Sequence, residues 1–176
     1  LLHDKCRSTD DDVRHLVALI SDTGVRLGEA TGLKVADIKI DCPTPHIHIR
    51  PNPIRRLKTK QSEREVPLIG ASLWAAKRVL AASSGEYAFP RYVKNGTCLA
   101  NSASATLNKW IRSNICNDLV VHGLRHGFRD RLREVGCPPE ITDSLGGWSR
   151  HSIGESYGDG YSLKAKHEWL SKIILE

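Results

Sequence analysis

The sequence predicts an α+β fold that is mainly helical, with a small antiparallel sheet on one side. Several long stretches carry apolar residues at helical spacing, whereas three short stretches in the first half alternate or cluster apolar residues as strands do. A hydrophobic share of 40% and a charged share of 26% are ordinary for one globular domain. We therefore expect a single core built mostly between helices.

The clearest helical pattern follows an acidic run. Thr9–Asp12 suits the positive end of a helix dipole, and Val13, Leu16, Val17 and Ile20 follow at helical spacing. Further helices are predicted over residues 71–82, 103–115, 122–135, 139–145 and 162–174.

Three strands are expected over residues 35–40, 46–50 and 65–68, paired into the small sheet. The second alternates strictly, so His46 and His48 share one face. Without a third ligand nearby, they are interpreted as strand-face residues rather than metal ligands. The five cysteines are widely spaced and odd in number, which indicates neither a disulfide framework nor a zinc site.

The formal charge of +6 and the pI near 9.2 favour a polyanionic partner, although charge alone does not establish one. The densest cationic stretch is residues 50–64, with six basic side chains against one acidic. Such a run is often only a solvated loop, but a lysine at a hairpin tip can reach phosphate. No apolar run approaches the roughly 18 residues of a membrane span. Because the sequence contains no methionine, we expect it to be a piece of a longer protein.

Four groups that can donate hydrogen bonds to an anion gather late in the chain. His122 and Arg125 stand three residues apart on one helix face, with His126 as a rival to His122, and Trp148 and Tyr157 follow. Each has a structural alternative, since histidine and arginine on a helix or a core tryptophan are common.

Arg26 and Glu29 stand three residues apart on a short helix after Gly24, which permits a sharp break in the chain. They form either a surface ion pair or an arginine that Glu29 orients towards phosphate. We hypothesise that Arg26 and Lys58 join the late cluster around one phosphodiester.

Taken in order, these residues resemble the catalytic domain of the tyrosine recombinases, the phage-integrase type of site-specific DNA recombinase. The motifs that carry the resemblance are TGVRLGE at residues 23–29 for TGxRxxE, residues 57–68 for the lysine-bearing hairpin that ends in VPL, HGLRH at residues 122–126 for the HxxRH box, and LGGW at residues 145–148. The family's nucleophilic tyrosine lies nine residues after the last motif, which selects Tyr157 over Tyr161.

The resemblance implies the recombinase catalytic-domain fold over residues 9–161. Residues 1–8 would then be the end of an interdomain linker, because they show no periodicity. Residues 162–176 would be a C-terminal tail helix that can dock in trans on a neighbouring protomer.

The resemblance also implies a set of site residues. The six catalytic residues would be Arg26, Lys58, His122, Arg125, Trp148 and Tyr157, and Glu29 would support Arg26. The register of the hairpin leaves Lys60 open as an alternative to Lys58. Tyr157 would form a 3′-phosphotyrosyl intermediate with no metal and no cofactor. Basic side chains expected to contact DNA are Arg55, Arg56, Lys60, Lys109, Arg112 and Arg129.

The implied function is site-specific recombination for integration or excision of a mobile element. The partner would be double-stranded DNA at a specific site, bound by a homotetramer that is a monomer or weak oligomer when free, in some cases with accessory DNA-bending proteins. The expected location is cytoplasmic, nucleoid-associated on DNA and without membrane contact. The alternatives are type IB topoisomerase-like DNA relaxation and a noncatalytic DNA-binding relative.

Overall fold

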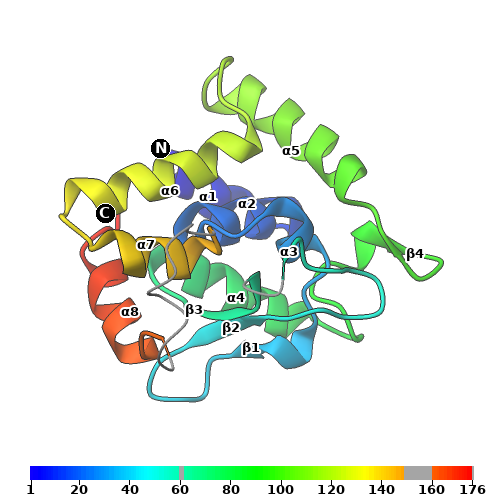
Figure 1. Cartoon of the computed structure of the whole chain (residues 1–176). Coiled ribbons are helices and arrows are strands. Elements are labelled where there is room, and N and C mark those ends of the chain that lie inside the picture. The colour runs from blue at the N-terminus through cyan, green and yellow to red at the C-terminus, as the bar shows by residue number, and fades with distance from the viewer. Residues whose placement is uncertain (60–61, 149–159, 176) are drawn as a thin grey trace.

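The computed structural model describes residues 1–59, 62–148 and 160–175. Within them the chain is mainly helical with a three-stranded antiparallel sheet, as predicted, and it also has a two-stranded antiparallel sheet that was not predicted. The helices pack around α2 (Asp12–Thr23), and the three-stranded sheet lies at the lower edge of the molecule in Figure 1. None of the described helices is long and apolar enough to cross a membrane.

The central helix begins and ends as its sequence predicts. The Asp11 side chain accepts a hydrogen bond from the backbone N–H of Arg14, and Gly24 ends the helix in the left-handed region. From His15 to Thr23 every residue of α2 is buried. This helix therefore supplies the middle of the core.

Residues 1–8 are largely helical, which the absence of periodicity did not predict, and their role as the end of an interdomain linker stays a prediction. Most of them belong to α1 (Leu2–Thr9), which packs on α2. His3 and Cys6 lie one turn apart and are buried, and the His3 ring nitrogen Nε2 lies 3.0 Å from Ser21 Oγ. Two buried positions, one of them a histidine, leave no apolar period for a sequence pattern to reveal.

Small side chains bring α4 (Gly70–Ala82) close to α2. Ala75 and Ala76 are almost fully buried at this contact. On the same helix Val79 is also buried, whereas Leu73 and Leu80 are only partly buried. Alanine lets two helices approach closely, so the larger leucines lie at the edge of the interface.

The three-stranded sheet has the order β1-β2-β3 and all its pairs are antiparallel. Ile47 and Ile49 point into the core, whereas His46 and His48 lie on the opposite face, as predicted. The first strand is shorter than expected because its first residues form a 3-10 turn, η1 (Val35–Asp37). The strands are β1 (Ile38–Lys39), β2 (His46–Ile49) and β3 (Arg64–Pro67).

A second group of elements surrounds the ends of α2 and β3. On α6 the apolar side chains of Leu124, Phe128 and Leu132 are buried. The elements are α3 (Leu27–Thr31), η3 (Pro90–Tyr92), the hairpin β4 (Val93–Lys94) and β5 (Thr97–Cys98), α5 (Ala100–Asn114), α6 (Val121–Glu134) and α7 (Pro139–Gly146).

The tail helix α8 (Leu163–Ser171) packs on β3 of its own chain. Leu170 and Ile173 are buried, and Lys166 Nζ donates to the Glu65 carbonyl at 3.3 Å. Arg131 of α6 donates to the Ile173 carbonyl at 3.1 Å. Docking of this tail on a neighbouring protomer stays a prediction.

Candidate active site

Gly24 brings the two arginine-bearing segments together. Its φ is 62°, and a Cβ at this position would lie 2.2 Å from the ring of Phe128 on α6. Only glycine allows this approach. The Gly24 carbonyl accepts a hydrogen bond from Arg125 Nη1, so segments 101 residues apart in the chain are neighbours.

Arg26 is held in place by several acceptors. Its backbone N–H and its Nη1 donate to the two carboxylate oxygens of Glu29, at 2.8 and 2.7 Å. Its Nη1 also donates to Ser62 Oγ at 3.2 Å, and its Nη2 donates to the Gly147 carbonyl at 2.8 Å. The Arg26 side chain keeps 29% of its surface exposed, whereas Glu29 keeps 5%. Arg26 is therefore oriented and still accessible to an anion.

Arg64 of β3 belongs to the same network, and sequence reasoning missed it. Its Nη2 lies 2.9 Å from Glu29 Oε2, and its Nε donates to the Leu145 carbonyl at 2.7 Å. The strand period was the available signal, because Arg64 and Val66 alternate with Glu65 and share the buried face of β3. A charged residue at an inward strand position indicates a buried ion pair.

The Glu29 carboxylate is an anion in this network. Its burial acts to raise its pKa, but hydrogen bonds and charge from Arg64, together with the hydrogen bonds from Arg26, hold the pKa below its usual value. Glu29 therefore carries one negative charge between two guanidinium groups.

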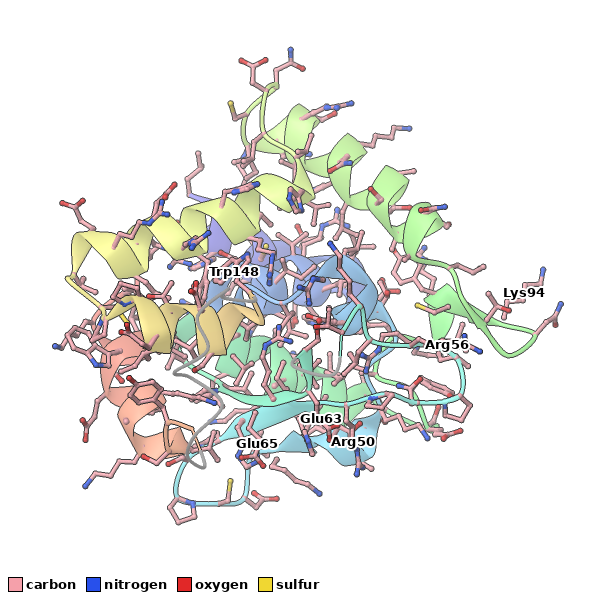
Figure 2. All side chains as sticks on the ribbon, in the orientation of Figure 1. Arg50, Arg56, Glu63, Glu65, Lys94 and Trp148 are labelled. Atoms are coloured by element: carbon pink, nitrogen blue, oxygen red, sulfur yellow. The ribbon has the colours of Figure 1, made fainter. Side chains whose placement is uncertain are left out.

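Arg125 lies under Trp148. The Arg125 guanidinium is centred 4.2 Å from the Trp148 ring centroid, and its Nη2 donates to the Gly146 carbonyl at 2.6 Å. Arg129 approaches the same ring at 4.8 Å, and Figure 2 shows Trp148 between α6 and α7. A Cβ on Gly146 would lie 1.9 Å from the indole, so glycine is needed for this placement of the ring.

Positive charge exceeds negative charge at this site. Arg125 is 4% exposed and has no carboxylate at ion-pair distance among the residues the structure describes. Burial, followed by the charges of Arg26 and Arg64, lowers the pKa of Arg125 to about 10. Arg26 and Arg64 share the Glu29 carboxylate, whereas Arg125 donates to backbone carbonyls, so the site carries excess positive charge that an anion would balance.

His122 and Lys58 are more exposed than Arg26 and Arg125. His122 is exposed at the start of α6, with its ring centroid 4.7 Å from that of His126. Partial burial, together with the charges of His126 and Arg125, lowers the pKa of His122. Lys58 is exposed in a bend between β2 and β3. Tyr157 lies outside the described residues.

The basic residues expected to contact DNA differ in accessibility. Arg55 is 7% exposed and donates to the Arg50 carbonyl at 2.7 Å, so the structure does not place it on a DNA-facing surface. Arg55 can be buried because Gly32 leaves room for its side chain. The sequence did not predict this burial, since Gly32 belongs to another segment of the chain. Arg129 is partly buried and pairs with Asp143. The exposed members are Arg56, which is labelled in Figure 2, Lys109 and Arg112, and Lys60 lies outside the described residues.

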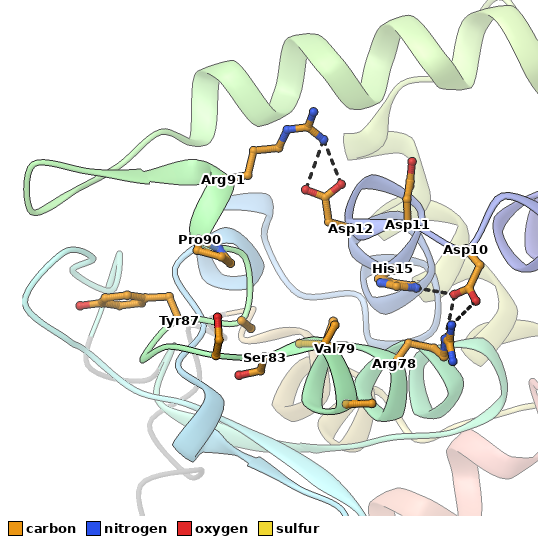
Figure 3. A pocket seen from close by; sticks show the side chains of 14 residues that line it. Asp10, Asp11, Asp12, His15, Arg78, Val79, Ser83, Tyr87, Pro90 and Arg91 are labelled. Carbon is orange, nitrogen blue, oxygen red and sulfur yellow. Dashed lines mark hydrogen bonds and ion pairs between the residues drawn. The ribbon is translucent and has the colours of Figure 1, made fainter.

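A pocket of about 480 Å³ lies between the start of α2 and the end of α4, and none of the five predicted catalytic residues that the structure describes lines it (Figure 3). Two acidic side chains that line the pocket form ion pairs with neighbouring basic side chains. Asp12 pairs with Arg91 at 2.9 Å, and Asp10 pairs with His15 and Arg78 at 2.7 and 2.5 Å. We assign it no phosphate-binding role. In the described part of the chain, His, Cys, Asp and Glu form no group suited to a metal ion.

Comparison with known proteins identifies the family. The profile of the phage integrase family matches residues 2–162, which is most of the chain. This chain belongs to the phage integrase family. The family profile begins within α1, in agreement with the packing of that helix on α2.

One relative in sequence and one in structure are similar to this chain. The tyrosine recombinase XerD of Corynebacterium glutamicum is 29% identical over 151 residues, covering 82% of this chain and 47% of XerD. The Tn1549 transposon integrase in complex with transposon right end DNA has a TM-score of 0.57 at 18% identity, covering 90% of this chain. The same integrase in complex with a circular intermediate DNA has a TM-score of 0.59 at 17% identity. This chain spans about half of XerD and 58% of the integrase chains, and it has the tyrosine recombinase catalytic-domain fold.

Proposed function

We propose that this chain is the catalytic domain of a site-specific DNA recombinase that cleaves and rejoins strands through a 3′-phosphotyrosyl intermediate. The observation that carries the proposal is the excess of buried positive charge where α2, α3, α6 and α7 meet. Arg26 is oriented by Glu29 and Arg125 is buried without a carboxylate partner among the described residues. A buried charge without a partner is costly, so the site is built to receive an anion such as a phosphodiester.

The proposed chemistry is a transesterification. Tyr157 Oη attacks phosphorus, and the new bond replaces the bond from phosphorus to the 5′ oxygen of the leaving strand. Tyrosine has a reference pKa of about 10, so a base must take its proton. His122 fits this task, because its lowered pKa favours the neutral imidazole. Lys58, with Lys60 as the alternative, gives a proton to the 5′ oxygen.

The two arginines stabilise the transition state. Arg26 and Arg125 hold the nonbridging oxygens, and Trp148 adds its indole N–H. Bond energy is kept in the phosphotyrosine, so a 5′-hydroxyl of a second strand can reverse the step.

The proposed partner is double-stranded DNA at a specific site, bound by a homotetramer, for integration or excision of a mobile element. The likeness to a transposon integrase solved with DNA supports this role. Arg56, Lys109 and Arg112 are the exposed cations proposed to contact the DNA backbone. Docking of α8 in trans, accessory bending proteins and a cytoplasmic, nucleoid-associated location belong to the same proposal.

Covalent trapping tests the proposal. The full-length protein is incubated, in EDTA, with a nicked duplex that carries its site, recovered by selection from a random duplex library. We expect a 3′-linked protein–DNA adduct in a denaturing gel and its complete loss in Tyr157→Phe. The matched control is Tyr161→Phe, which should keep the adduct, since Tyr161 is 41% exposed and lies off the motif spacing.

Other outcomes separate the alternatives. An adduct that persists in Tyr157→Phe, or one that disappears with EDTA, would overturn the mechanism. Salt-sensitive binding without any adduct would indicate the noncatalytic relative. Relaxation of supercoiled DNA of any sequence would indicate the topoisomerase alternative.

A further inference from the structure

Arg64 is the cation of the site to which the proposed chemistry gives no task. Its side chain is 4% exposed. Its Nη1 donates to the Ser62 carbonyl at 2.7 Å and to Glu29 Oε1 at 3.2 Å, its Nη2 to Glu29 Oε2 at 2.9 Å, and its Nε to the Leu145 carbonyl at 2.7 Å. One guanidinium thus joins α3, the segment before β3 and the end of α7.

These are the segments that hold Arg26. Ser62 Oγ and the Gly147 carbonyl accept from Arg26, at 3.2 and 2.8 Å. A Cβ on Gly147, whose φ is 63°, would lie 2.7 Å from Arg64 Nη1, so the backbone that leads to Trp148 lies directly on the Arg64 guanidinium. The position of Arg64 therefore determines where both Arg26 and Trp148 lie.

Charge gives Arg64 a second effect. Glu29 contacts Arg26 through 2.7 and 2.8 Å hydrogen bonds, and with no other cation it would cancel the charge that Arg26 offers to phosphate. Arg64 supplies a second positive charge to the same carboxylate. The Arg26–Glu29–Arg64 triad then carries a net charge of about +1, which remains available on the exposed member, Arg26.

We infer that Arg64 is a positioning residue for strand cleavage, because it balances Glu29 and aligns Arg26 with Trp148. This rests on the proposed function. Lysine cannot replace it fully, since an ammonium group is a point charge without the planar fork that reaches Glu29 and Leu145 together.

The test compares Arg64→Lys, Arg64→Gln and the double variant Arg64→Gln with Glu29→Gln in the full-length protein on the nicked site duplex. Single-turnover cleavage is measured at saturating protein, binding by titration, and folding by urea unfolding. Arg64→Gln should slow cleavage by about 100-fold, as expected for misplaced catalytic groups, with Kd changed less than about 3-fold because exposed cations dominate DNA affinity. Arg64→Lys should fall between this variant and the wild type.

Partial recovery of the cleavage rate when Glu29→Gln is added to Arg64→Gln would not be expected if Arg64 had only a structural role. Glu29→Gln removes the carboxylate that Arg64→Gln leaves unbalanced, so the double variant should cleave at least about tenfold faster than Arg64→Gln. The matched control is Arg131→Gln, which unbalances the buried Asp22 carboxylate on the far part of α6. It should lower stability without changing the cleavage rate.

Three results would overturn the inference. They are wild-type cleavage by Arg64→Gln, an equal loss in Arg131→Gln, and a double variant no faster than Arg64→Gln. If Arg64→Gln does not fold, a folded Arg64→Lys that cleaves at the wild-type rate overturns it instead. Absence of an adduct with the wild type is a failure of the proposed function itself, and the two failures are therefore distinguishable.

Discussion

At Gly24, backbone conformation, packing and hydrogen bonding impose the same requirement. The residue has a positive φ, lies against the Phe128 ring and offers its carbonyl to Arg125. The glycine of the first arginine motif is therefore needed as much for the approach of α6 as for the turn that precedes Arg26.

Gly24→Ala should destabilise the fold by about 2–4 kcal/mol, the sum of a strained positive φ and an overpacked contact. Urea unfolding would measure it. Gly127→Ala is the matched control, because Gly127 lies within α6 and a Cβ there would meet no side chain or neighbouring element within 4 Å. Alanine there should stabilise by about 0.5–1 kcal/mol. Equal effects at the two positions would contradict this account of Gly24.

Site residues differed in how well the sequence predicted them. Arg26, Glu29 and Arg125 came from motif spacing, and the structure brings them together with the Trp148 segment. Arg64 was not predicted from motif spacing, because an arginine within a basic stretch is expected to be solvated like its neighbours. Its burial is decided by Glu29 and Leu145, which lie 35 and 81 residues away in the chain.

Helix α1 is held on α2 partly by polar contacts. His3 meets Ser21 and Asp22 of α2, and Arg131 of α6 approaches the same carboxylate at 3.1 Å. Burial lowers the pKa of His3, helped by the charge of Arg131 and opposed by that of Asp22. The folded protein therefore favours neutral His3.

This direction predicts acid sensitivity of the fold. Since the folded pKa of His3 lies below its unfolded value of about 6.5, its contribution to stability is full above that pH. The contribution is lost as pH falls from there through the folded pKa. His3→Gln should reduce the loss of unfolding free energy between about pH 7.5 and 5.5, measured with urea at both pH values. An unchanged or larger loss in the variant would refute the assignment to His3, whose charged neighbours are Asp22, Arg131, Arg7 and the N-terminal amine.

At the scale of the whole molecule, the net charge of +6 is unevenly distributed over the surface. Acidic side chains gather around the pocket at the start of α2, where Arg78 and Arg91 pair with them. Exposed cations such as Lys58, Arg56 and Lys109 lie on other elements, outside that pocket. The surface charge is therefore divided between regions.

Salt dependence of DNA binding tests this division. Each phosphate contact adds about 0.9 to the slope of log affinity against log salt concentration, so Arg56→Gln and Lys109→Gln should each reduce the slope by about that amount. Lys77→Gln is the matched control, because Lys77 is exposed on α4 and lies in no predicted DNA contact. Binding titrations over a range of salt concentrations give the slopes. A reduction for Lys77→Gln equal to the others would show that the contacts are not confined to the predicted residues.

The sequence by itself determined the helical core, the three-stranded sheet and the family, because apolar periods and motif spacings are local properties of the chain. Helix α2 and strand β2 formed where their patterns placed them. Only the tertiary structure decided that residues 1–8 pack as a helix, that Arg55 is buried and that Arg64 shares Glu29 with Arg26. Arg64 binds Glu29 and Leu145, which lie 35 and 81 residues away, and Arg55 packs on Gly32 of another segment. The free energy of burying a polar group depends on such partners, which no local pattern contains.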